Sequence, residues 1–154
     1  MNYCLKRYID PMKNIILFLS IVSISLNAFA CSFPNRNDEE KFANADRVFR
    51  AKIIATKLVT EEIHGDKGEV IHATYKLIES YKGKTPQEGI VRELPFGPGN
   101  CMIGLMTGTE YIIYIDNKYN FVTLPSGSWG YFNAEGTEVQ SKINELRERA
   151  KKIM

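Results

Sequence analysis

The side chains best suited to covalent or metal chemistry in this chain are three cysteines and two histidines: Cys4, Cys31, Cys101, His64 and His72. The chain contains no H-E-x-x-H, C-x-x-C or G-x-S-x-G signature and no glycine motif that would cradle a phosphate. His64 lies beside a Gly-Asp turn, and His72 falls on the polar face of an expected strand, so we expect both to be solvated surface residues. The carboxylates form no distinctive pair. We therefore expect no enzymatic activity, no cofactor and no intrinsic metal site.

The N-terminal 30 residues have the pattern of a secretory signal peptide. Residues 15–30 are apolar and uncharged, Lys13 precedes them, and Ala28-Phe29-Ala30 forms an A-x-A cleavage site. We expect cleavage between Ala30 and Cys31, which leaves residues 31–154 as one mature domain that is secreted or periplasmic. Met12 is an alternative initiator, because Met12-Lys13-Asn14 would begin a more usual signal peptide.

Two alternatives to a secretory signal peptide remain open. An uncleaved N-terminal anchor is disfavoured by length, because a spanning helix needs about 20 apolar residues and this run has 16. A lipoprotein signal ending at Cys31 usually has leucine three residues before the cysteine and a small residue two before it. Ala28 and Phe29 occupy those positions, so lipid anchoring is the minor alternative. After cleavage we expect no membrane span.

The predicted removal of Cys4 with the signal peptide changes how many cysteines the mature chain contains. Cys31 and Cys101 then form an even pair in an oxidising compartment, which favours one disulfide, with two free thiols as the alternative. Such a bridge would close a loop of about 70 residues and stabilise the domain by roughly 4 kcal/mol. It would also tie the new N-terminal residue to the body of the domain.

The charge balance of the mature chain excludes one class of function. The chain has 20 Lys and Arg and 18 Asp and Glu, of which three and one lie in residues 1–30. The remaining 124 residues therefore carry 17 of each and are neutral. Nucleic-acid binders depend on a positively charged surface, so we expect no nucleic-acid partner.

The apolar pattern predicts a mainly β domain with a helix at each end. A capping asparagine, Asn37, followed by acidic residues predicts a short helix that reaches Ala45. Alternating residues then predict five strands, at 48–59, 70–81, 90–94, 110–116 and 121–124. In the first of these, Phe49, Ala51, Ile53 and Ala55 should face inward. Because no helix separates the strands, we expect an antiparallel barrel or sandwich.

The last segment of the chain should form an amphipathic helix. Thr137-Glu138-Val139-Gln140 has the form of a capping box. Five apolar residues then recur at helical spacing and form one stripe: Val139, Ile143, Leu146, Ala150 and Ile153. We expect this stripe to pack against the strands rather than on a membrane surface.

Several stretches of the chain resemble the tissue inhibitors of metalloproteinases, whose inhibitory domain belongs to the netrin-like modules. Residues 42–52, FANADRVFRAK, resemble the family's F-C-N-A-D-x-V-x-R-A-K at its opening helix and first strand. Residues 81–83, Tyr-Lys-Gly, resemble its aromatic-Lys-Gly, and residues 101–111 resemble its C-x₃-L-x₂-G…E-Y stretch. Cys31 resembles the family's first mature residue.

The resemblance implies a five-stranded OB-fold barrel and a Cys31–Cys101 bridge. The chain departs from the animal inhibitors at Phe33 and Ala43, where they have cysteines, and the partners of those cysteines are absent too. The family's C-terminal domain is also missing. The chain is therefore similar to a single-domain relative of bacterial type.

The family's mechanism implies a role for each residue of a candidate inhibitory edge. The amine and carbonyl of Cys31 would chelate the catalytic zinc of a target metalloendopeptidase, and Ser32 would point toward its specificity pocket. Gly99 and Asn100 would flank this contact. Pro34 is one position away from the family's early proline. We expect a monomer with a zinc protease as its partner; the alternative is a non-inhibitory extracytoplasmic binding module, because a fold alone does not determine function.

Overall fold

The fold is known from a computed structural model, which describes residues 36–63, 65–97, 99, 101–117 and 120–153. The signal peptide, its cleavage site and residues 31–34 lie outside the described residues, as do Cys4, His64 and Asn100. Expectations about Cys31 and Ser32 therefore remain predictions.

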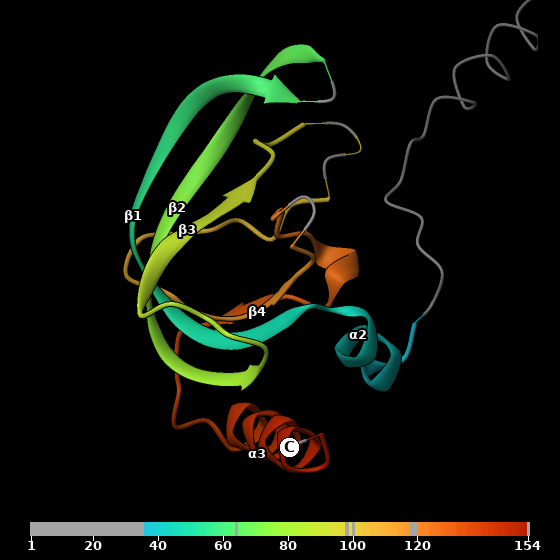
Figure 1. The fold of residues 1–154 in the computed structure, drawn as a ribbon. Coiled ribbons are helices and arrows are strands. Elements are labelled where there is room, and N and C mark those ends of the chain that lie inside the picture. The colour runs from blue at the N-terminus through green and yellow to red at the C-terminus, as the bar shows by residue number, and fades with distance from the viewer. Residues whose placement is uncertain (1–35, 64, 98, 100, 118–119, 154) are drawn as a thin grey trace, which may run out of the picture. The chain divides into compact units, whose positions relative to one another are not determined.

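The described part of the chain is mainly β, with one five-stranded antiparallel open sheet and two α-helices (Figure 1). The strands are β1 (Arg47–Ile63), β2 (Asp66–Lys82), β3 (Glu88–Glu93), β4 (Glu110–Ile115) and β5 (Trp129–Tyr131), arranged in the order β3-β2-β1-β4-β5. The helices are α2 (Asp38–Asn44) and α3 (Thr137–Lys151), and a 3₁₀ turn, η2 (Leu124–Ser126), precedes β5. The mainly β fold class and its antiparallel pairing are confirmed.

Helix α2 begins where the sequence predicts. The side chain of Asn37 accepts a hydrogen bond of 2.8 Å from the backbone N–H of Glu40, and three acidic residues occupy the first turn. The buried ring of Phe42 attaches the helix to the sheet. The helix ends at Asn44, because Ala45 is already extended.

Removing the Asn37 cap should destabilise helix α2. We expect Asn37→Ala to lower the free energy of unfolding by about 1 kcal/mol, because one N-terminal N–H loses its acceptor. Asn37→Asp, which retains an acceptor oxygen, should be close to neutral. Urea unfolding followed by circular dichroism measures both. Equal losses in the two variants would contradict a capping role.

The long hairpin formed by β1 and β2 corrects one sequence prediction. Phe49, Ala51 and Ile53 are fully buried, as the alternation predicts, but Ala55 is exposed. The reason is that β4 pairs only with residues 47–52 of β1, so the distal half of β1 has no strand on that side. Each strand of the hairpin is 17 residues long and extends beyond the core (Figure 1).

Strand β4 contributes residues to two apolar clusters, one on each face of the sheet. Its alternate residues Tyr111, Ile113 and Ile115 join one cluster with Phe49 and Tyr75 on one face of the sheet. Ile112 and Tyr114 join a second cluster on the other face with residues of α2 and α3. Because both faces of β4 are covered, residues 111–115 are all aromatic or aliphatic and show no alternation with polar residues.

The fifth strand was predicted at the wrong place. Residues 121–124 form only one isolated bridge, between Phe121 and Arg92, before the chain turns at η2. Pro125 and the left-handed Gly127 stop any extended run there. The actual β5 has three residues, Trp129–Tyr131, and a central glycine, so its pattern is too short to recognise by alternation.

Helix α3 packs against the sheet through the predicted stripe. Ile143, Leu146 and Ala150 are buried in the second cluster, whereas Ile153 lies beyond the helix end and is 57% exposed. The predicted capping box is wrong, because Gly136 occupies the N-cap position and no side chain caps the helix. Thr137 is instead the first helical residue.

Candidate functional site

Gly99 of the predicted inhibitory edge and Cys101 of the predicted disulfide lie within the described part of the chain. Gly99 and Cys101 lie in the connection between β3 and β4. Gly99 is exposed with φ of +80°, in the left-handed region that glycine adopts without strain. Cys101 is half-buried with φ of +43°, an uncommon conformation for a residue with a Cβ atom. Its sulfur lies 3.3 Å from the carbonyl oxygen of Gly99.

A buried carboxylate holds the backbone that follows Cys101. Glu93, the last residue of β3, is fully buried. Its Oε1 accepts hydrogen bonds from the backbone N–H groups of Ile103 (2.5 Å) and Gly104 (2.9 Å), and its Oε2 accepts one from Leu105 (2.8 Å). In all three bonds a backbone N–H is the donor and a side-chain oxygen of Glu93 is the acceptor. The loop is therefore anchored two residues after Cys101.

No sequence motif marks Glu93 as a functional residue. A weak signal was available, because Val91 and Glu93 occupy alternate positions of a short strand and so face the same side. An acidic residue on the inward side of a strand must find partners, since an unpaired buried charge is strongly unfavourable. The sequence does not reveal that these partners are backbone N–H groups ten to twelve positions later.

Tyr111 forms a second anchor for the same loop. Its hydroxyl donates a hydrogen bond of 2.7 Å to the carbonyl of Gly104 and accepts one of 2.9 Å from the N–H of Met106. Burial raises the pKa of the Tyr111 phenol, so the hydroxyl keeps the proton it donates at neutral pH. Glu93 and Tyr111 together fix four consecutive residues of the loop.

The preceding part of the connection is open to solvent. Phe96 is 92% exposed, and it lies on the same connection as the exposed Gly99. Cys101, further along the same connection, is attached to the start of η2, because its carbonyl accepts a hydrogen bond of 2.9 Å from the N–H of Leu124. The β3–β4 connection thus combines an exposed apolar side chain with a firmly held cysteine.

The stretches that resemble the inhibitor family meet one another in space. Lys82 of the second stretch donates a hydrogen bond of 2.9 Å to the carbonyl of Phe42 at the end of α2. Arg50 of the first stretch forms an ion pair of 2.7 Å with Glu110 of the third. These residues therefore join α2, β1, β2 and β4 into one unit.

The glycine of the second stretch has a packing role in the same unit. Gly83 has φ of +71°, and a Cβ atom at this position would lie 2.5 Å from the carbonyl oxygen of Asp46. Any larger residue would push the end of β2 away from the start of β1. The carboxylate of Asp46 also accepts a hydrogen bond from the N–H of Asn117.

His72 corrects the expectation of a solvated surface histidine. Its side chain is 20% exposed, and its Nε2 lies 3.0 Å from Oε2 of Glu61. Arg92 forms an ion pair of 2.7 Å with the other oxygen of Glu61. Burial opposes ionisation of Glu61, but the hydrogen bond from His72 and the charge of Arg92 outweigh it and hold the pKa of Glu61 below its ordinary value. This cluster ties the hairpin to β3.

The described residues include no group of three or more His, Cys, Asp or Glu side chains that could hold a metal ion. In the same part of the chain, no helix combines the length and apolar character needed to cross a bilayer. Comparison of the chain with models of protein families finds no match, and comparison with curated protein sequences finds none either.

Proposed function

We propose that this protein is an exported inhibitor of zinc metalloendopeptidases with a netrin-like OB-fold barrel. The proposal rests on contacts among the three family-like stretches, residues 42–52, 81–83 and 101–111. Lys82 donates a hydrogen bond to the carbonyl of Phe42, and Arg50 forms an ion pair with Glu110. Residues that resemble a family because of a shared fold should contact one another, whereas a chance resemblance would scatter them over the molecule.

Further support for a barrel comes from the free edge of β3. The backbone N–H of Arg92 donates to the carbonyl of Asn120 (3.2 Å), and the N–H of Val122 donates to the carbonyl of Arg92 (2.7 Å). These bonds join the outer edge of β3 to the segment that follows β4. Contacts that cover the outer edge of β3 in this way support the proposal, because a closed OB-fold barrel leaves few free strand edges.

The inhibitory group would be the N-terminal residue of the mature chain. The amine nitrogen and carbonyl oxygen of Cys31 would occupy the coordination position that a catalytic zinc leaves open for water. An α-amino group has a pKa of roughly 7.7–8.0, so it can lose its proton to a zinc ion near neutral pH. Ser32 would enter the specificity pocket of the protease.

The β3–β4 connection would give this N-terminus its rigidity. A Cys31–Cys101 disulfide would attach residue 31 to a loop that Glu93 and Tyr111 hold through five hydrogen bonds. Rigid presentation lowers the entropy lost on binding. The exposed Phe96 and Gly99 would lie on the same edge and contribute to the contact with the protease.

Adding one residue before Cys31 tests the mechanism directly. We expect the extended protein to lose inhibition by at least 100-fold, because a peptide bond replaces the amine that would bind zinc. Inhibition constants against a panel of zinc endopeptidases measure the effect, with mature protein that begins at Cys31 as the reference and intact mass to verify each N-terminus.

Two controls separate loss of the amine from loss of the fold. The extended protein should retain the circular dichroism spectrum of the reference, because additions at an exposed terminus are tolerated. Ser32→Gly should weaken inhibition only moderately, because it leaves the amine in place. Equal inhibition by reference and extended protein would refute zinc chelation by Cys31. If neither form inhibits any protease of the panel, the non-inhibitory binding module becomes the better proposal.

A further inference from the structure

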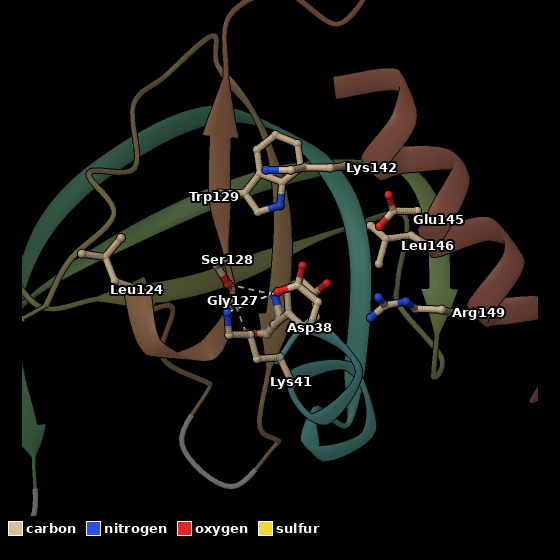
Figure 2. A pocket seen from close by; sticks show the side chains of 11 residues that line it. Asp38, Lys41, Leu124, Gly127, Ser128, Trp129, Lys142, Glu145, Leu146 and Arg149 are labelled. Carbon is tan, nitrogen blue, oxygen red and sulfur yellow. Dashed lines mark hydrogen bonds and ion pairs between the residues drawn. The ribbon is translucent and has the colours of Figure 1, made fainter. Parts of the chain in front are cut away.

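A second candidate site is a cavity of about 260 Å³ bordered by α2, α3 and the segment from η2 to β5 (Figure 2). Its lining combines cationic, aromatic and aliphatic side chains, among them Lys41, Tyr114, Trp129, Lys142, Leu146 and Arg149. Sites for drug-sized ligands occupy roughly 300–1,000 Å³, so this cavity suits a smaller molecule.

The guanidinium of Arg149 has a hydrogen-bonding capacity that the fold does not use. Its Nη1 is buried, and no described residue accepts a hydrogen bond from it. In Figure 2 the side chain points from α3 across the cavity toward α2. Burying a charged donor without a partner is unfavourable, and native structures normally satisfy such groups. Arginine presents its donors as a planar fork that fits a carboxylate.

The side chains that line the cavity include three cations and two carboxylates. Lys41 pairs with Asp38 at 3.3 Å, so these two charges offset each other. Lys142 lies 5.2 Å from the centre of the Trp129 ring and makes an ion pair of 3.5 Å with Glu138, which does not line the cavity. Both lysines therefore have a carboxylate partner, whereas Nη1 of Arg149 has no acceptor among the described residues.

The remaining walls suit an apolar group. Leu146 is buried in the second core cluster, and Trp129 packs against the same cluster. Tyr114 contributes a largely buried ring, and burial raises the pKa of its hydroxyl to about 12, so the hydroxyl stays protonated at neutral pH and can donate a hydrogen bond. An anionic group and a flat apolar group can thus be accommodated together.

We propose that this cavity binds a small organic carboxylate, whose anionic group pairs with Arg149 and whose apolar group lies against Trp129 and Leu146. The same chemistry is offered by a free aromatic acid and by the C-terminal residue of a peptide. The site does not include Cys31, so this proposal can be tested independently of protease inhibition.

Trp129 makes the proposal directly measurable, because it is the chain's single tryptophan and it lines the cavity. We expect intrinsic fluorescence to change saturably when N-acetylphenylalanine or phenylacetate is added at neutral pH. N-acetylphenylalanine amide, which has the same shape without the charge, should bind at least tenfold more weakly. Tighter binding of N-acetylphenylalanine than of phenylacetate would indicate that the ligand is the C-terminal residue of a peptide. Tighter binding of phenylacetate would indicate a free aromatic acid.

Variants on α3 test the role of Arg149. Arg149→Gln should weaken binding of the preferred acid at least tenfold, and Arg149→Lys should restore part of the loss. Lys151→Gln removes an exposed charge from the same helix, paired with Glu148 outside the cavity, and should leave binding unchanged. The proposal is wrong if the unaltered protein shows no saturable change or binds acid and amide equally. It is also wrong if folded Arg149→Gln binds as tightly as the unaltered protein.

Discussion

Replacing Glu93 with alanine is expected to lower the free energy of unfolding by about 3–5 kcal/mol, among the largest effects of any single substitution in this domain. The substitution removes a fully buried carboxylate and leaves the N–H groups of Ile103, Gly104 and Leu105 without their acceptor. The hydrogen bond from Leu105 is buried and the other two are partly buried, and a buried donor that loses its acceptor costs about 1–3 kcal/mol, less where water can reach it. Urea unfolding of the purified variant measures the loss.

A more conservative change distinguishes the lost acceptors from the lost volume. Glu93→Gln fills the same space and can still accept from Ile103 and Gly104, but its amide group meets the N–H of Leu105 as a second donor. We expect an intermediate loss of about 1–3 kcal/mol. Glu88→Gln, at an exposed position of the same strand, should change stability by less than about 0.5 kcal/mol. Similar stability of all three variants and the unaltered protein would contradict the anchoring role of Glu93.

Removing the predicted disulfide is the second change with a large expected effect. Cys101→Ser in exported protein should lower the free energy of unfolding by about 2–5 kcal/mol, because the unfolded chain regains the freedom of a long loop. If the protein is an inhibitor, the same substitution should also weaken inhibition, since the amine of Cys31 would no longer be held in position. Unfolding and inhibition assays on the same preparation measure both effects.

The identity of the bridge requires a chemical measurement as well. Peptide mapping without reduction should recover a peptide that joins Cys31 to Cys101. Adding a reductant to the unaltered protein should reproduce the stability of Cys101→Ser, whereas Cys4→Ser should have no effect because that residue is predicted to be removed with the signal peptide. Recovery of both thiols in alkylated form before reduction would refute the bridge and leave two free cysteines.

Local features of the fold could be predicted from short stretches of sequence. The N-terminus of α2 follows from Asn37 and the acidic residues after it, because a cap depends only on groups within one turn. The packed face of α3 follows from Ile143, Leu146 and Ala150, which recur at the helical period. The central part of β1 follows from alternation at Phe49 and Ala51 in the same way.

The candidate site could be predicted only in part. Gly99 and Cys101 were identified through a resemblance, and the structure adds the reason why this connection is firmly held, which is the buried carboxylate of Glu93. The unpartnered Nη1 of Arg149 could not be predicted, because in the sequence it is one of several basic residues on an amphipathic helix.

Local sequence patterns therefore specify the features that arise between near neighbours: the mainly β class, the alternation within strands and the packed helix faces. Tertiary structure alone decided the position of β5, the exposure of Ala55 and the partners of Glu93. The physical reason is common to all three. Each depends on which distant segment covers a residue or satisfies its polar groups, and the free energy of that contact exceeds the local preference of the residue itself.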